Sequence, residues 1–253
     1  MTIQYCSDLH LEFSLNKKFI AKYPIIPKGE VLLMAGDIVP FAVMDEHHDF
    51  FNYLADNFEQ TYWVPGNHEY YHTDIANKSG SIKEAIRTNV FLVNNVEVQL
   101  QKLRFIFSTL WSSISPANYI TIQNRMADFS AIQNKGAKFT PENYNQLHLQ
   151  CKNFIVQALS NNSSTPAMVI THHIPTFLNY PVKYKRDILN EAFAVELHDF
   201  IEQSNIDYWL YGHHHFNTPA FTIGKTTLLT NQLGYIKYKE NTGFKNDAVI
   251  ELK

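Results

Sequence analysis

The chain contains the stretch Trp209-Leu210-Tyr211-Gly212-His213-His214-His215, in which an apolar run is closed by a glycine and three histidines. The apolar run predicts a buried strand, and Gly212 allows the backbone to leave it. In extended backbone, residues two apart point to the same side, so His213 and His215 can converge while His214 points elsewhere. Imidazole is the commonest protein ligand for transition metals. This strand end therefore predicts half of a metal site, with a histidine-rich surface turn as the alternative interpretation.

Four other predicted strands also end in polar side chains of the metal-ligand type. These strands span residues 3–7, 31–35, 61–64 and 167–171. The polar residues that follow them are, in the same order, Asp8 and His10, Asp37, Asn67 and His68, and His172. In open α/β sheets, ligands bind at the carboxyl ends of the strands. We therefore expect all five strand ends to contribute to one site.

The segments between the strands predict flanking helices. Residues 45–58 place apolar side chains near helical spacing, with Asp45 as the N-cap. Thr140-Pro141 predicts another helix start, and a further helix is expected at about residues 191–203. Residues 11–30 are polar and show no regular pattern. This alternation of strands and helices predicts an α/β fold.

The composition is that of an ordinary globular protein, with 253 residues, 45% hydrophobic and 18% charged side chains. Without a linker, low-complexity tract or internal repeat, we expect one domain spanning residues 1–253. The net charge of −3 provides no basic field to attract nucleic acid or anionic lipid. We find no secretion signal and no apolar run of membrane-spanning length, so we expect a cytoplasmic location and no membrane partner. Cys6 and Cys151 are expected to be buried thiols rather than a disulfide.

The number and type of candidate donors indicate two metal ions rather than one. Four imidazoles, two carboxylates and one amide oxygen are available besides His68, which is more than one ion needs. Nitrogen and oxygen donors without thiolate suit Mn, Fe, Zn or Co, as divalent or trivalent ions, in a hydrolytic site. Two such ions can together hold a hydroxide nucleophile and stabilise charge on a transferring phosphoryl group.

The five strand ends resemble, in their order and spacing, the motifs of the calcineurin-like metallophosphoesterases. The resemblance covers residues 8–215 and rests on Asp8-Leu9-His10, Gly36-Asp37, Gly66-Asn67-His68-Glu69, His172 before Pro175, and Gly212-His213-His214-His215. Each motif alone is weak, whereas five in order are specific. The resemblance implies two mixed β-sheets packed as a sandwich and flanked by helices, with the site at the carboxyl ends of the strands.

The resemblance also implies a role for each candidate residue. One metal ion would be held by Asp8, His10 and His215, the other by Asn67, His172 and His213, and Asp37 would bridge the two. His68 would not be a ligand. It would lie over the substrate, where an imidazole can stabilise the phosphoryl oxygens or protonate the leaving group.

The chain departs from the protein serine/threonine phosphatases of this superfamily at two arginines. Their second motif continues Gly-Asp-x-x-Asp-Arg-Gly and their third begins Arg-Gly-Asn-His, whereas here Ile38-Val39-Pro40 follows Asp37, and Val64-Pro65 precedes Gly66. Without these arginine forks, which hold phosphate with two hydrogen bonds, protein dephosphorylation is disfavoured.

The expected activity is metal-dependent hydrolysis of a small phosphomonoester or phosphodiester, with a metal-bridging hydroxide as nucleophile. A cyclic nucleotide or a glycerophosphodiester is a candidate diester, and a nuclease activity is disfavoured because the chain lacks a basic track. The alternative from another class is a non-catalytic scaffold that binds metal on the same fold. The sequence does not predict an oligomeric state.

Several polar residues near the motifs have weaker expectations. His173 is expected beside a ligand or facing substrate, and Glu69 is expected to be structural. Arg125 and Asp128 lie in a segment, residues 111–146, that we interpret as a substrate-contacting insert. For this pair a surface salt link is an equal alternative. The basic residues Lys183, Lys185 and Arg186 are expected on a solvated loop.

Overall fold

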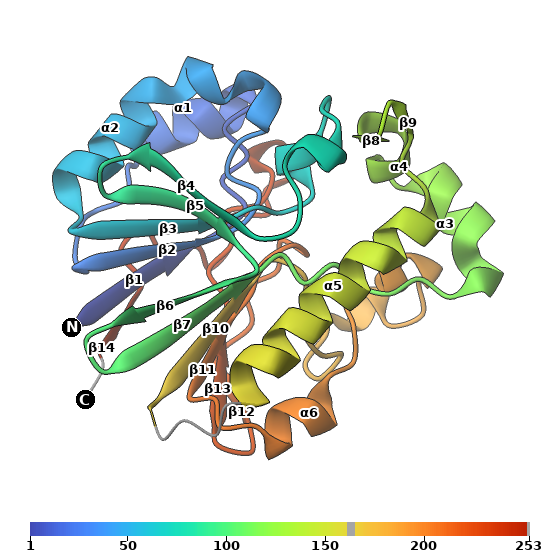
Figure 1. Cartoon of the computed structure of the whole chain (residues 1–253). Coiled ribbons are helices and arrows are strands. Elements are labelled where there is room, and N and C mark those ends of the chain that lie inside the picture. Colours follow the sequence, from blue (N-terminus) through green and yellow to red (C-terminus); the bar gives the residue numbers. More distant parts are fainter. Residues whose placement is uncertain (161–164, 252–253) are drawn as a thin grey trace.

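Two six-stranded sheets form the centre of the computed structural model, which describes residues 1–160 and 165–251 (Figure 1). The first sheet has the order β14 (Val249–Glu251), β1 (Thr2–Cys6), β2 (Val31–Ala35), β3 (Gln60–Val64), β5 (Val90–Asn94), β4 (Ile82–Arg87). The second has the order β12 (Phe221–Ile223), β13 (Thr226–Leu229), β11 (Tyr208–Leu210), β10 (Ala167–Thr171), β7 (Leu103–Ser108), β6 (Val96–Leu100). In each sheet four central strands are parallel, and one antiparallel strand closes each edge.

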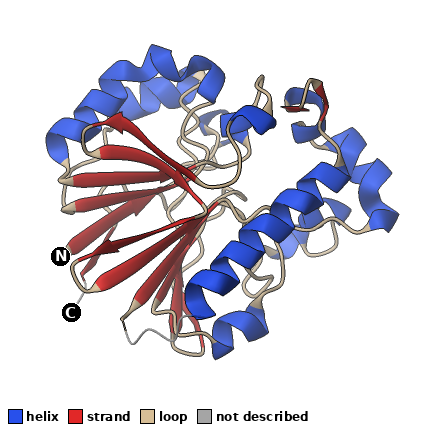
Figure 2. Ribbon diagram, in the orientation of Figure 1, coloured by secondary structure: helices blue, strands red, loops and turns tan. Residues whose placement is uncertain are grey.

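Helices cover the outer face of each sheet (Figure 2). The first sheet is covered by α1 (Ser14–Lys22) and α2 (His48–Asn57), and the second by α5 (Pro141–Ser160) and α6 (His198–Gln203). Two short helices, α3 (Tyr119–Arg125) and α4 (Asp128–Ala131), and the hairpin β8 (Gln133–Asn134) and β9 (Ala137–Lys138) lie beside α5. The predicted α/β class, with two mixed sheets between helices, is confirmed.

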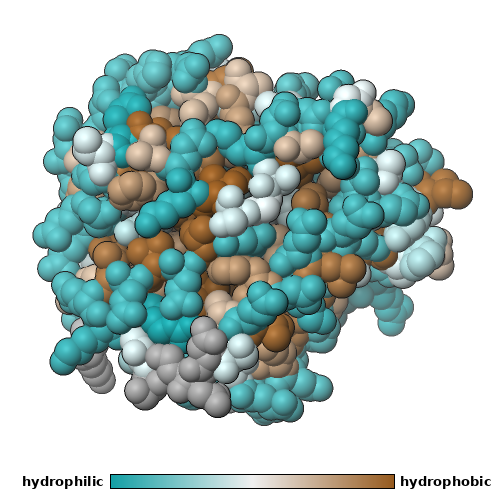
Figure 3. All heavy atoms as spheres, in the orientation of Figure 1, coloured by the Kyte–Doolittle hydropathy of each residue, from teal (hydrophilic) through white to brown (hydrophobic). Residues whose placement is uncertain are grey.

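The central strands are apolar throughout because both of their faces are buried. In β2, Leu32 and Met34 join the core under α1 and α2, whereas Val31, Leu33 and Ala35 join the core between the sheets. Strand β10 divides its side chains in the same way between the sheet interface and the core under α5 and α6. In the orientation of Figure 1, hydrophobic residues gather towards the centre of the surface in Figure 3, where side chains fill the space between the sheets.

Three predictions about helices need correction or refinement. Helix α1 lies within the segment that we expected to be irregular, because only Asn16 and Ile20 of this helix are buried and its apolar stripe is too narrow to recognise. The predicted helix 45–58 begins as a 3-10 helix, Phe41–His47, so Asp45 is not the N-cap of α2. The helix expected at residues 191–203 is divided between a 3-10 helix, Ile188–Ala192, and α6.

The predicted helix start at Thr140-Pro141 and the two predicted buried thiols are confirmed. Helix α5 begins at Pro141, and the hydroxyl of Thr140 accepts a hydrogen bond from the backbone N–H of Asn143 at 3.3 Å. The hairpin of β6 and β7 turns at Gln101, which has a positive φ of 52°. Cys6 and Cys151 are buried free thiols. In the described part of the chain, no helix is both long and apolar enough to cross a membrane.

The parallel pairing places the carboxyl ends of the central strands at the same edge of the molecule. Strands β1, β2 and β3 are neighbours in register, and so are β10 and β11. Across the sandwich, β2 packs against β10. The five polar strand ends predicted from the sequence therefore meet where the two sheets lie side by side.

Candidate metal centre

The backbone turns sharply at the strand ends that carry the candidate ligands. Five of the seven candidates adopt left-handed backbone conformations, with φ between 47° and 84°: Asp8, His10, Asp37, His213 and His215. Such conformations cost of order 1–3 kcal/mol each outside glycine and cluster at functional sites. Because each residue leaves its strand in this way, its side chain projects over the edge of the sheet.

Two glycines make room for the side chains that converge there. A Cβ on Gly66 would lie 2.2 Å from Oδ1 of Asp37, and one on Gly36 would lie 2.3 Å from Nδ1 of His172. Gly36 also has a φ of 89°, which other residues rarely adopt. The motif glycines are thus required by the packing of ligand side chains against the backbone.

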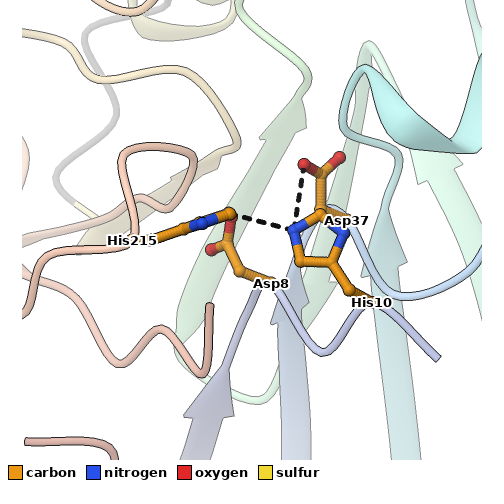
Figure 4. A group of neighbouring side chains, drawn as sticks. All are labelled: Asp8, His10, Asp37 and His215. Atoms are coloured by element: carbon orange, nitrogen blue, oxygen red, sulfur yellow. Dashed lines mark hydrogen bonds and ion pairs between the residues drawn. The ribbon is translucent and has the colours of Figure 1, made fainter. Parts of the chain in front are cut away.

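The first donor group consists of Asp8, His10, Asp37 and His215, whose donor atoms all lie within 4.8 Å of one another (Figure 4). The Nε2 atoms of His10 and His215 are 2.9 Å apart, and Oδ1 of Asp8 is 3.4 Å from Nε2 of His215. Nε2 of His10 lies 3.7 Å from Oδ2 of Asp37. Four donors from β1, β2 and the loop after β11 therefore point at one small volume.

The second donor group consists of Asp37, His172 and His213, again with donor atoms within 4.8 Å. Nε2 of His172 lies 3.0 Å from Nδ1 of His213 and 3.4 Å from Oδ2 of Asp37. The same His172 atom is 3.1 Å from Oδ1 of Asn67, which adds an amide oxygen to the group. Asp37 belongs to both groups, as a carboxylate shared by two ions would.

Each of the four imidazoles is held at the nitrogen that faces away from the donor groups. The partners are Glu12 for Nδ1 of His10 (3.1 Å), Glu240 for Nδ1 of His215 (2.7 Å), the Ala35 carbonyl for Nδ1 of His172 (2.9 Å) and the Ala192 carbonyl for Nε2 of His213 (3.2 Å). Metal-binding histidines usually have such an acceptor, which fixes the ring and leaves the inner nitrogen free to bind an ion.

The charges of the two groups support cation binding. Burial alone would raise the pKa of Asp37, but the imidazoles of His172 and His68 hold it well below its usual range. Burial opposes protonation of His215, yet its hydrogen bonds with Asp8 and Glu240 raise its pKa to about 10. Buried carboxylates thus remain ionised, and without metal ions neighbouring imidazoles bear the compensating protons.

His68 lies beside the donor groups with a different set of contacts. Its Nδ1 is 3.1 Å from Oε1 of Glu12, its Nε2 is 3.1 Å from the hydroxyl of Tyr235, and its ring stacks on Tyr71 at 4.1 Å. Burial lowers the pKa of His68, but Asp37 and Glu12 outweigh burial and raise the pKa above its usual value. His68 can therefore carry a proton at the rim of the metal centre.

Two buried acids orient the candidate ligands through hydrogen bonds. Oδ1 of Asp128 accepts a hydrogen bond from Nδ2 of Asn67 at 2.8 Å, which turns the amide oxygen towards His172. Glu69 accepts hydrogen bonds from the backbone N–H groups of Asp37, Ile38 and Gly66 and from Nε1 of Trp63. The structural role expected for Glu69 agrees with these contacts.

Residues 1–217 match the family model of the calcineurin-like phosphoesterases. The chain belongs to this family. The uncharacterized protein L509 of Acanthamoeba polyphaga mimivirus is 32% identical over 278 residues, covering 99% of this chain and 96% of that protein. Membership of this family indicates metal-dependent phosphoester hydrolysis as the general activity. The donor groups described above are suited to metal ions.

A solved structure of low sequence identity shares the fold. The phosphopantetheinyl hydrolase PptH of Mycobacterium tuberculosis superposes with a TM-score of 0.66 and 16% identity, over 93% of this chain and 90% of its own. A dimetal phosphatase from Danio rerio has a TM-score of 0.48 and 12% identity, over 92% of this chain and 87% of its own.

The other motif residues of this family member lie outside the donor groups. His173 is buried, with its Nε2 3.0 Å from the Tyr144 hydroxyl, and it does not line the cleft above the metal centre. His214 points towards Gln232 rather than towards the donors, as expected. The expectation rested on extended backbone, whereas His213 and His215 have left-handed backbone, with φ of 84° and 50°. Arg125 forms an exposed ion pair with Asp187 at 3.6 Å. For this arginine, the surface salt link is therefore the correct one of the two predictions.

Four residues near the metal centre were not predicted from the sequence: Glu12, Tyr71, Tyr235 and Glu240. Glu12 had a local signal, because it lies two residues after His10 and so can share its side of the chain. Tyr71 and the two C-terminal residues had no such signal. Their positions depend on how loops far apart in sequence pack over the strand ends.

Proposed function

We propose that the protein hydrolyses a small organic phosphoester with the help of two metal ions. The observation that carries the proposal is the pair of donor groups that share Asp37, with His68 beside both. Asp8, His10 and His215 would hold one ion, and Asn67, His172 and His213 the other. The imidazole, carboxylate and amide donors fit Mn, Fe, Zn or Co. When bound, the ions would neutralise charge on the phosphoryl oxygens and lower the pKa of a water molecule.

His68 is suited to deliver a proton to the leaving group. Glu12 holds Nδ1 of His68, so the Nε2 edge is directed towards the cleft and the hydroxyl of Tyr235. Asp37 and Glu12 raise the pKa of His68 above its usual value, which favours the protonated ring that a general acid needs. General-acid catalysis by a positioned imidazole typically contributes about 10²–10⁴-fold to the rate.

The charge of the cleft favours a phosphodiester over a phosphomonoester. Among the described residues that line the cleft, the carboxylates Asp37, Asp187 and Glu240 face one lysine, Lys237, and no arginine. A diester bears one negative charge, whereas a monoester bears close to two at neutral pH. Asp37 would be balanced by the metal ions, Asp187 pairs with Arg125 and Glu240 with His215, so Lys237 is the one lysine among the described lining residues left to balance further charge on a substrate. The less anionic substrate is therefore better matched to this cleft.

Hydrolysis assays with defined metals test the proposal. Metal-free protein is reconstituted with two equivalents of Mn, Fe, Zn or Co and assayed with bis-p-nitrophenyl phosphate and p-nitrophenyl phosphate. We expect hydrolysis of both esters with at least one metal, a higher kcat/KM for the diester, and no activity after chelation. If two equivalents of every metal bind and neither ester is hydrolysed, a non-catalytic scaffold is the better description.

A further inference from the structure

Aromatic side chains line one wall of the cleft, next to the first donor group. This first wall consists of Phe13, Tyr235 and Tyr238. The rings of Phe13 and Tyr235 lie 5.3 Å apart at 89°, and those of Tyr235 and Tyr238 lie 6.0 Å apart at 79°. The ring of Tyr235 also lies 4.5 Å from that of His215. The wall therefore begins at the metal centre and extends outwards to Tyr238.

A second aromatic wall lies next to the second donor group. It consists of Tyr180, Tyr184 and Phe193, all from the segment between β10 and α6. Phe193 stacks on the ring of His213 at 4.5 Å and 27°. Each donor group thus has its own aromatic wall, and the two walls come from separate parts of the chain.

The first wall is exposed enough to contact a ligand in the cleft. Phe13 is 43% exposed and Tyr238 is 64% exposed, although large aromatic side chains are stabilised by burial. The cavity volume of about 710 Å³ lies within the range of about 300–1,000 Å³ that is usual for small-molecule sites. A phosphate group alone would fill only a small part of this space.

The polar residues of the cleft limit the charge of that ligand. Asp187 and Glu240 line the space outside the donor groups, and Lys237 is the one lysine among the described lining residues. Asp187 pairs with Arg125 at 3.6 Å and Glu240 with His215 at 2.7 Å, so few cations remain in the described lining to balance additional negative charge, such as that of polyphosphates or nucleic acid. Flat aromatic rings without charge match both the aromatic walls and this shortage of cations.

We propose that the two walls bind uncharged, planar aromatic groups on the two sides of a phosphodiester, so that the protein is selective for aromatic diesters. This inference rests on the phosphoesterase function proposed above. A diester has an organic group on each side of phosphorus, and the metal centre has an aromatic wall on each side. Stacking of flat rings on aromatic side chains is expected to favour aromatic over aliphatic esters by about tenfold or more.

Three diesters with the same leaving group and the same charge test the inference: the methyl, cyclohexyl and phenyl esters of p-nitrophenyl phosphate. With protein reconstituted with its best metal, we expect kcat/KM for the phenyl ester to exceed that for the methyl ester about tenfold. The cyclohexyl ester, which is bulky but not flat, should stay within about threefold of the methyl ester. A cyclohexyl ester as good as the phenyl ester would overturn selectivity for planar groups.

Substitutions in each wall locate the effect. Tyr184→Leu and Tyr238→Leu each replace a ring by an aliphatic side chain, and neither tyrosine has a ring contact with a candidate ligand. The phenyl-to-methyl ratio should fall about fivefold or more in at least one variant and further in the double variant. Tyr23→Leu, at an exposed tyrosine outside the cleft, is the matched control and should keep the wild-type ratio.

The outcomes separate this inference from the proposed function. If the wild-type protein hydrolyses all three esters equally, or if the double variant keeps the wild-type ratio, the aromatic walls are not a substrate site although the protein is a phosphodiesterase. If none of the three esters is hydrolysed with any metal, the diesterase function itself is wrong and the inference falls with it.

Discussion

The two sheets have the same arrangement of parallel and antiparallel strands, yet they supply different chemistry to the metal centre. The first sheet supplies both carboxylates and the amide, with one imidazole: Asp8, Asp37, Asn67 and His10. The second sheet supplies only imidazoles: His172, His213 and His215. All of the fixed negative charge among the candidate ligands therefore comes from one half of the sandwich.

The two halves also stabilise their donors differently. Carboxylates of the first sheet accept hydrogen bonds from backbone N–H groups: Asp37 from His68 at 3.0 Å, and Asp8 from His213 at 3.0 Å. Imidazoles of the second sheet instead donate to acceptors such as the Ala35 carbonyl and Glu240. The first sheet therefore supplies the negative charge of the centre, while the second supplies imidazoles whose orientation is fixed by these acceptors.

The largest effect is expected from Asp37→Ala, because Asp37 is the one carboxylate that belongs to both donor groups. Loss of this carboxylate should reduce bound metal from two equivalents to less than one and bring hydrolysis to background. Metal content by elemental analysis and kcat with bis-p-nitrophenyl phosphate measure the two effects. Asp56→Ala, which removes an exposed carboxylate from α2 outside the donor groups, is the control and should change neither value.

The second prediction concerns His68, which follows β3 like a ligand but should not bind metal. His68→Asn should lower kcat by about 10²–10⁴-fold, since a general acid is lost, while two equivalents of metal remain bound. If the variant loses its metal, His68 is needed for metal binding, and its assignment as a residue outside the ligand set is wrong.

The third prediction separates the partners of His10 and His215. Glu12→Gln should lower kcat/KM about 10–100-fold at saturating metal, because Glu12 holds both His10 and the proton-donating His68. Loss of its charge should also lower the pKa of His68. Since His68 acts in its protonated form, the alkaline limb of the profile of kcat/KM against pH should shift to lower pH.

Glu240→Gln is the matched control for this pH effect. Glu240 holds His215 at 2.7 Å and makes no hydrogen bond with His68 among the described contacts. Metal affinity should fall in this variant, whereas the alkaline limb should stay in place at saturating metal. If the alkaline limb of the pH profile shifts equally in both variants, this limb does not reflect the titration of His68.

The smallest effect is expected within the histidine cluster itself. His214→Asn should retain two equivalents of metal and activity within about threefold of the wild type, because His214 contacts Gln232 and not the donor groups. His213→Asn, one residue earlier, should lose about one equivalent of metal. Similar metal loss in both variants would contradict the placement of His214 outside the donor groups.

The sequence predicted which polar residues meet at the candidate metal centre, because a simple rule brings them together. Parallel strands in one sheet end at one edge, so polar residues directly after such strands meet there. The positions of Asp8, Asp37 and His172 follow from the predicted strands alone. Glu240 and Tyr235 depend instead on a C-terminal loop whose path is set by packing over His215, and no local pattern marks them.

The helices were predicted less well than the strands for a related reason. Helix α5 has a capping threonine, a proline at its first position and a wide buried face, so it was recognisable. Helix α1 lacks a side-chain cap and buries only two residues. Its helicity depends on tertiary contacts rather than on a pattern that the sequence displays.

The left-handed backbone at five candidate ligands limits how stable the metal-free protein can be. Conformational strain of about 1–3 kcal/mol at each of these residues would together rival the whole free energy of unfolding of a typical domain, about 5–15 kcal/mol. Glycine at such a position would relax the backbone but remove a donor. Metal binding to the folded protein would offset this strain, so removal of metal should lower the unfolding temperature.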